Sequence, residues 1–116
     1  MTTSSPHPEL IDRVRAALYS ESTREVRMFG GVSFMVNDAL AVAVNRDGAL
    51  LVRVDPRRNA ELLARPYAAR AEMGVGRSMG AGWIRVSGAG IAEPADLNQW
   101  IADALDHLAR RQLARR

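Results

Sequence analysis

The fold of this chain is decided by the stretch Arg27-Met28-Phe29-Gly30-Gly31-Val32-Ser33-Phe34-Met35-Val36. Its second half alternates, so that every other residue from Val32 to Val36 is apolar and lies on one face of an extended chain, which is the period of a strand. Two glycines inside such a pattern mark a bulge, a tight bend or a close approach by another backbone or a ligand. The stretch predicts one bent strand, or two short ones, over residues 26–36. We interpret the glycine pair as a structural bulge and keep a recognition loop as the alternative.

The segments that follow continue the sheet. Asn37-Asp38 is a turn pair that tolerates positive φ, and Gly48 suits the left-handed position of a second turn. A glycine-rich loop over residues 74–82 separates the last two apolar stretches. Strands are therefore predicted over 26–36, 39–44, 49–54, 67–73 and 83–86.

Three helices are predicted around these strands. One begins at Pro8, a short one begins at Asp55-Pro56, and a long one begins at Pro94, because proline is tolerated in the first turn of a helix. The last helix carries an apolar stripe at helical spacing, made of Leu97, Ile101, Ala104, Leu105 and Leu108. The order α-β(3)-α-β(2)-α predicts an α+β fold with a mostly antiparallel five-stranded sheet.

Length and composition indicate one ordinary domain. The 116 residues contain 47% hydrophobic and 25% charged side chains and no cysteine, which excludes disulfides, thiolate metal sites and a cysteine nucleophile. Residues 1–8 have no apolar core of a signal peptide. We expect a cytoplasmic protein without a membrane segment, formed by a single domain over residues 1–116 in which residues 1–7 and 111–116 are flexible.

The positive charge is concentrated at the C-terminus. The basic residues are all arginine, and the last seven residues contain Arg110, Arg111, Arg115 and Arg116. The other 109 residues hold 12 arginines against 13 acidic residues, so the body of the domain is close to neutral. These four arginines could contact nucleic-acid phosphates, although arginines at a helix C-terminus also complement the helix dipole without any partner.

Several of these features together resemble a known family. The Met28-Phe29-Gly30-Gly31 element after a first helix, the hairpin after it, and Leu50–Val54 followed by Asp55 are similar to the N-terminal domain of the TfoX/Sxy competence regulators. The stretch from Arg77 through Met79 to Trp83–Val86, and the closing helix with Trp100, are similar as well. The resemblance covers about residues 8–110.

The resemblance implies a small α-β(3)-α-β(2)-α domain. It also implies a link to DNA uptake and competence genes, where the family acts alongside the cyclic-AMP receptor protein at promoters. Longer members carry a second, helical domain, for which 116 residues leave no room, so we expect a stand-alone domain. The family supplies no established catalytic residues.

No motif for chemistry emerges from the residues themselves. The glycine-rich loop lacks the spacing of a dinucleotide fingerprint or a P-loop and runs into a strand, so we interpret it as a strand connection rather than a phosphate cradle. His107 and Asp103 lie four residues apart on the last helix, and we interpret them as an exposed pair, since a metal site needs three or four ligands. We expect no metal, no cofactor and no enzymatic activity.

The sequence therefore favours a regulatory module that binds a protein partner, such as a transcription regulator, as a monomer or homodimer. The residues expected to form the contact surface are Phe29, Gly30, Gly31, Arg77, Ser78, Met79 and Trp83. Two alternatives remain open: nucleic-acid binding through Arg110, Arg111, Arg115 and Arg116, and small-ligand binding at the glycine-rich loop.

Overall fold

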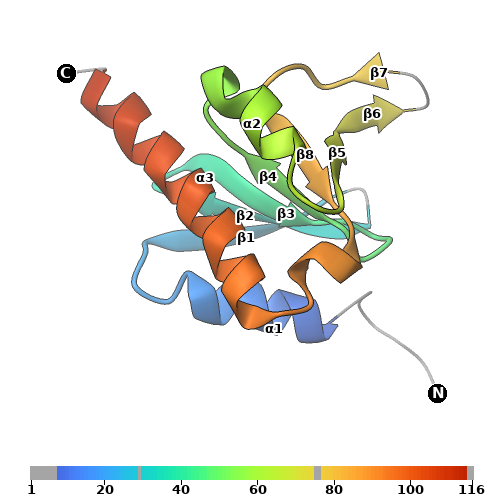
Figure 1. The fold of residues 1–116 in the computed structure, drawn as a ribbon. Coiled ribbons are helices and arrows are strands. Elements are labelled where there is room, and N and C mark those ends of the chain that lie inside the picture. Colours follow the sequence, from blue (N-terminus) through green and yellow to red (C-terminus); the bar gives the residue numbers. More distant parts are fainter. Residues whose placement is uncertain (1–7, 29, 75–76, 115–116) are drawn as a thin grey trace.

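The computed structural model, which describes residues 8–28, 30–74 and 77–114, contains one antiparallel sheet with helices packed against one of its faces (Figure 1). The strand order in this sheet is β1-β2-β3-β4-β8-β5. The first four strands are consecutive in sequence and form a meander. Their bounds, with those of the other two strands, are Thr23–Met28 (β1), Gly31–Val36 (β2), Ala39–Val44 (β3), Leu50–Arg53 (β4), Ala68–Arg70 (β5) and Trp83–Val86 (β8).

The α+β class is confirmed, but the sheet has six strands rather than five. One difference is that residues 26–36 form two strands, the second of the alternatives predicted. The segment 67–73 also divides, because β5 is followed by β6 (Glu72–Gly74). Strand β6 pairs with β7 (Arg77–Ser78) in a separate two-stranded sheet, so part of the expected glycine-rich loop is a small hairpin.

The glycine pair does not form a bulge, because Gly30 lies in a turn and Gly31 begins β2. Gly30 has φ +79° and lies between β1 and β2, whose first pair beyond the turn is Met28 with Gly31. The register of this sheet shifts instead between Phe34 and Met35, where β2 pairs with β3. The bulge interpretation was wrong because a turn at a glycine leaves the same sequence pattern as a bulge: an alternating strand interrupted by a residue of unusual backbone conformation.

The other turns follow the predictions. Asn37 (φ 52°) and Asp38 (φ 66°) join β2 to β3, and Gly48 (φ 89°) lies in the turn between β3 and β4. Asp55 precedes a 3₁₀ turn, Pro56–Arg58, and its Oδ1 accepts a hydrogen bond from the backbone N–H of Arg57 at 3.0 Å. A carboxylate that caps free N–H groups at this position stabilises the first turn.

Three α-helices cover one face of the six-stranded sheet: α1 (Pro8–Ala17), α2 (Asn59–Leu63) and α3 (Pro94–Ala114). Their apolar residues join the inward residues of β2, β3, β4 and β8 in one buried cluster. The largest fully buried side chains are Phe34, Leu18, Leu50, Leu62, Ile84 and Ile91. The core is aliphatic, and Phe34 and Trp100 are its only aromatic members among the described residues.

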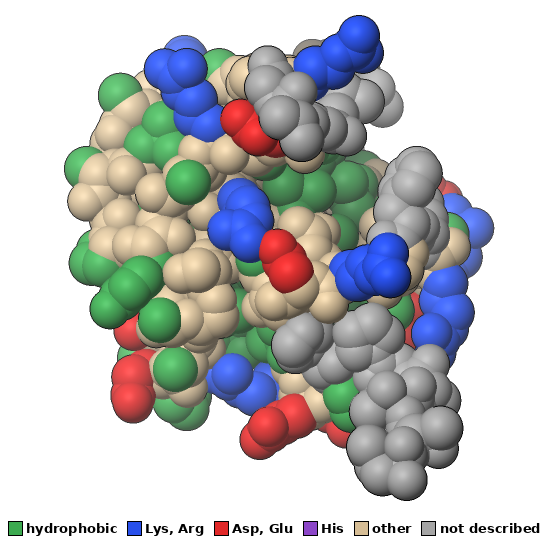
Figure 2. All heavy atoms as spheres, turned by 90° about the vertical axis from the view of Figure 1, so that its right-hand side faces the viewer, with side chains coloured by type: hydrophobic (Ala, Val, Ile, Leu, Met, Phe, Trp, Pro, Cys, Tyr) green, Lys and Arg blue, Asp and Glu red, His purple; other side chains and the backbone are tan. Residues whose placement is uncertain are grey.

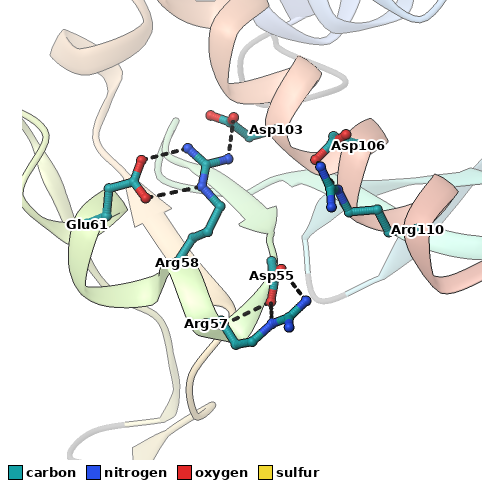
Figure 3. Close-up of polar contacts among 7 residues, drawn as sticks. All are labelled: Asp55, Arg57, Arg58, Glu61, Asp103, Asp106 and Arg110. Atoms are coloured by element: carbon teal, nitrogen blue, oxygen red, sulfur yellow. Dashed lines mark hydrogen bonds and ion pairs between the residues drawn. The ribbon is translucent and has the colours of Figure 1, made fainter. Parts of the chain in front are cut away.

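One prediction about α3 was wrong. Asp103 and His107 do not form an exposed pair, because both are buried, at 6% and 9% exposure. The Asp103 carboxylate accepts a hydrogen bond from Arg58 Nη1 at 3.0 Å and another from Arg65 Nη1 at 2.6 Å. Figure 3 shows Arg58 lying between Asp103 of α3 and Glu61 of α2. Two guanidinium groups thus compensate the buried charge and join α2 and its flanking residues to α3.

Candidate functional site

The face of the sheet that is opposite the helices is the main candidate for an interaction surface. One row of paired residues crosses all six strands on this face: Val26, Ser33, Ala43, Leu51, Arg85 and Ala69. We call this row, together with Met35, the open face. None of these residues belongs to the buried cluster that the helices form with the sheet.

The open face is apolar at its centre. Val26, Met35 and Leu51 are half-buried, whereas Ser33 and Ala43, whose side chains are short, are buried. Arg85 crosses to Asp47 of the β3–β4 turn, and this hydrogen bond holds the pKa of the Asp47 carboxyl below its usual value. On the side of the molecule that carries the β6–β7 hairpin, hydrophobic side chains are gathered in a hollow with arginine side chains around it (Figure 2).

The residues expected to contact a partner lie near opposite edges of the sheet. Gly30 lies in the turn of the β1–β2 hairpin and Gly31 begins β2, both at the β1 edge of the sheet, and Phe29 lies outside the described residues. Arg77 and Ser78 form β7, in the hairpin that follows the opposite edge strand, β5. The structure therefore does not gather them in one cluster, and the open face extends between the two hairpins.

The β6–β7 hairpin is held at its base by backbone hydrogen bonds. The N–H of Met79 donates to the carbonyl of Ala71 at 2.8 Å, and the N–H of Ala71 donates to the carbonyl of Trp83 at 3.3 Å. The Ser78 hydroxyl accepts from the N–H of Gly80 at 3.0 Å. The Ser78 hydroxyl thus forms a hydrogen bond within its own turn, and the Arg77 side chain is exposed.

Trp83 lies beside the positively charged side chain of Arg53. It pairs across the strands with Arg53, whose guanidinium lies 5.2 Å from the centre of the indole ring. Burial lowers the pKa of Arg53, and the charge of Arg111 on α3 lowers it further. In the described part of the chain, neither arginine has a carboxylate partner within ion-pair distance. Arg53 thus lies beside Trp83, from one expected surface, and its pKa responds to the charge of Arg111, from the other.

The charges of Arg53 and Arg111 also affect the pKa of His107. Burial lowers its pKa, and the charges of Arg53 and Arg111 lower it further, against the opposing charges of Asp55 and Asp106. The imidazole is therefore neutral in the native protein at neutral pH.

We expect stability to fall as the pH is lowered from 7 to 5, and to fall less in His107→Gln. An unfolded histidine titrates near pH 6.5, so the unfolded chain takes up a proton in this window that native His107 refuses, and unfolding becomes easier. Denaturant unfolding at a series of pH values measures the difference. The carboxylates with lowered pKa values, such as Asp47 and Glu61, lose their stabilising contribution below this window. Equal pH profiles for the two proteins would contradict the burial of a neutral His107.

The C-terminal arginines differ in their surroundings. Arg110 forms an ion pair with Asp106 one turn earlier, at 2.9 Å (Figure 3). The charge of Arg111 instead lowers the pKa values of Arg53 and His107. Arg115 and Arg116 lie outside the described residues. Helix α3 itself continues through Arg111 to Ala114.

The structure gives less support to a small-molecule site or a metal site. A groove of about 470 Å³ lies between the start of α1, Gly48 and Ile91, away from the glycine-rich loop. The Arg13 guanidinium beside it already donates to the carbonyl of Ile91 at 2.7 Å. Within residues 8–28, 30–74 and 77–114, no three metal-binding side chains come together, and no helix is long and apolar enough to cross a bilayer.

The sequence analysis missed Arg53, Arg58 and Arg65, and it placed Asp103 on the surface although this residue is buried. Arg53 alternates with inward residues of β4 and could be placed outward, but its neighbour Trp83 is 30 positions away in sequence. Arg58 and Arg65 reach Asp103 across 45 and 38 positions. No local pattern identifies such partners, because they meet only when α2 packs against α3.

The comparison with known proteins agrees with this architecture. A family model described as the TfoX N-terminal domain matches residues 17–108, which include all strands of both sheets and most of α3. No curated protein and no solved structure gives a match. Because the matched range covers most of the 116 residues, the chain belongs to the TfoX N-terminal domain family.

Proposed function

We propose that this domain is a non-enzymatic regulatory module, related to competence, that binds a protein partner through its open face. One observation carries the proposal: the row from Val26 to Ala69 crosses the sheet without a helix of the described residues above it. A half-buried apolar centre with Arg85 in the same row has the composition of a protein interface, which is apolar at its core and polar at its rim.

Family membership supports the regulatory part of the proposal. The TfoX N-terminal domain is named for competence regulators, and a partner in the control of competence genes would fit that setting. The partner surface is therefore a better basis for function than a reaction.

The experiment uses a charge placed at the centre of the open face. Leu51 lies between Ala43 and Arg85 in the row, and because it is half-buried, Leu51→Glu puts a carboxylate on the surface rather than in the core. We expect partner affinity to fall by roughly tenfold or more, since apolar residues at an interface centre dominate binding. Proteins captured from an extract of the source organism, and then the purified partner by calorimetry, give the measurement.

The matched control is Tyr19→Glu, which adds the same charge to a side chain that is 89% exposed after the end of α1. This variant should retain the partner, and both variants should melt close to the parent. If Leu51→Glu captures the same partner with parental affinity, the open face is not the binding surface.

Nucleic-acid binding is the second candidate, and the uncompensated charges of Arg53 and Arg111 support it. Binding to phosphates releases counterions, so affinity for a DNA duplex should fall steeply with salt. Arg111→Ala should reduce that salt dependence. A salt-independent affinity, or none, would leave the protein partner as the only candidate of the two.

A further inference from the structure

Strand β1 (Thr23–Met28) is an edge strand of the six-stranded sheet, and its outer side has no strand partner in the described part of the chain. In an antiparallel pair, successive residues direct their backbone groups alternately toward and away from the neighbouring strand. The N–H of Asn37 donates to the carbonyl of Ser22 at 3.0 Å, which assigns the even-numbered residues to the β2 side. The backbone groups of Thr23, Glu25 and Arg27 therefore point outward and are available to another strand.

A second copy of the chain can meet this edge across a twofold axis, in an antiparallel pair. Outward residues of one copy pair with outward residues of the other, which leaves registers centred on Arg24, on Glu25, on Val26 or on Arg27. The register centred on Glu25 places two glutamates opposite each other, and those centred on Arg24 or Arg27 place two arginines opposite each other, which is unfavourable on directly paired positions. The register centred on Val26 places Glu25 of each copy opposite Arg27 of the other.

This register also agrees with the surroundings of each side chain. Glu25 is held in place by Arg15 of α1, through hydrogen bonds of 2.6 Å and 2.8 Å to its two oxygens. The bond from Arg15 lowers the pKa of Glu25, so the carboxylate is ionised, and its remaining lone pairs can accept from an arginine of a second copy. On the other side of the strand, the two Val26 side chains would meet at the centre of the pair.

We propose that two copies of this chain associate through β1, antiparallel and centred on Val26, with Glu25 of each copy paired with Arg27 of the other. Charges on an edge strand usually prevent such pairing, but here the two signs are placed so that they are complementary across the twofold axis. The two sheets become one continuous sheet, and the two open faces join at Val26 into one larger surface.

The test is a set of charge reversals on β1, with the mass of the particle measured by sedimentation from micromolar to millimolar concentration. The parent chain should dimerise. Arg27→Glu places two carboxylates opposite one another, and Glu25→Arg places two guanidinium groups opposite one another, so each variant alone should raise the dissociation constant by roughly tenfold or more. A mixture of the two variants restores both opposite-charge pairs and should form a heterodimer.

The matched control is Arg24→Glu, which makes the same charge reversal as Arg27→Glu three positions earlier on the same strand. Arg24 is exposed, points to the opposite face of β1 and lies opposite Met28 in the proposed register, so this variant should dimerise like the parent. Circular dichroism melts establish that all variants are folded, and the amides of Glu25 and Arg27 should become protected from hydrogen exchange as the concentration rises. The proposal is overturned if the parent stays monomeric throughout, or if Arg27→Glu dimerises as well as Arg24→Glu.

Discussion

Replacing Gly31 with valine is expected to lower the free energy of unfolding by about 3 kcal/mol, the upper end of the cost of inserting extra atoms into a packed region. A Cβ atom at Gly31 would lie less than 3.0 Å from the carbonyl oxygen of Val44, a contact that real Cβ atoms essentially never make. The oxygen belongs to the backbone of β3 and cannot rotate away. Strand β2 must therefore move away from β3 at the point where Val32 pairs with Val44.

Substitutions at two other glycines allow the cost of this backbone contact to be compared with the cost of conformational strain. Gly30 has φ +79°, and its Cβ would meet Arg46 Cδ at 2.9 Å, the end of a flexible side chain that can move. Gly80 has φ +96° and open space around it. Gly80→Ala should cost about 1 kcal/mol, the usual strain of a left-handed residue with a Cβ. Denaturant unfolding of Gly31→Val and Gly80→Ala compares them, and equal losses would show that the contact with Val44 costs no more than the strain at Gly80.

The sequence predicts those parts of the fold that depend on neighbouring residues. Asn37-Asp38 and Gly48 adopt the positive φ values expected of them, and Asp55 caps the turn that begins at Pro56. Each of these signals is complete within a few residues, because the turn or cap forms from the same segment that encodes it.

The sequence does not predict elements that exist only through pairing. Strand β1 begins at Thr23, in a polar stretch without alternation, because its backbone pairs with β2 from Val36 back to Gly31. Strands β6 and β7, of three and two residues, are too short to show any period. The open face was not anticipated for a related reason, since its row takes one residue from each of six strands, and only the register brings them together.

Asp103 shows the same limit for the polar interior. Its position on α3, four residues before His107, is visible in the sequence and suggested an exposed pair. Its burial depends on Arg58 and Arg65, which arrive from a different part of the chain. A buried carboxylate can be inferred only when its partners are known, because an unpaired charge would not remain in the interior.

Replacing Asp103 with alanine is therefore expected to lower the free energy of unfolding by about 3 kcal/mol, the lower end of the range for breaking a buried ion pair. The Asp103 side chain is 7% exposed and binds two guanidinium groups. Among the described residues, its removal leaves Arg58 with Glu61 as its carboxylate partner. It also leaves Arg65, whose guanidinium lies 4.6 Å from the centre of the Trp100 ring, without a carboxylate from this part of the chain. The loss stays at the lower end because the two arginine side chains are 34% and 27% exposed and water can solvate them.

The control for this change lies one turn further along the same helix. Asp106→Ala removes the same charge from α3, but within the described residues Asp106 pairs with Arg110 alone, and the two side chains are 52% and 65% exposed. Water screens such a pair, so the loss should stay within about 0.5 kcal/mol. Thermal and denaturant unfolding of the two variants compares them directly. If they lose equal stability, the guanidinium groups do not compensate a buried charge, and α2 is held in place by apolar contacts such as those of Leu62 in the buried cluster.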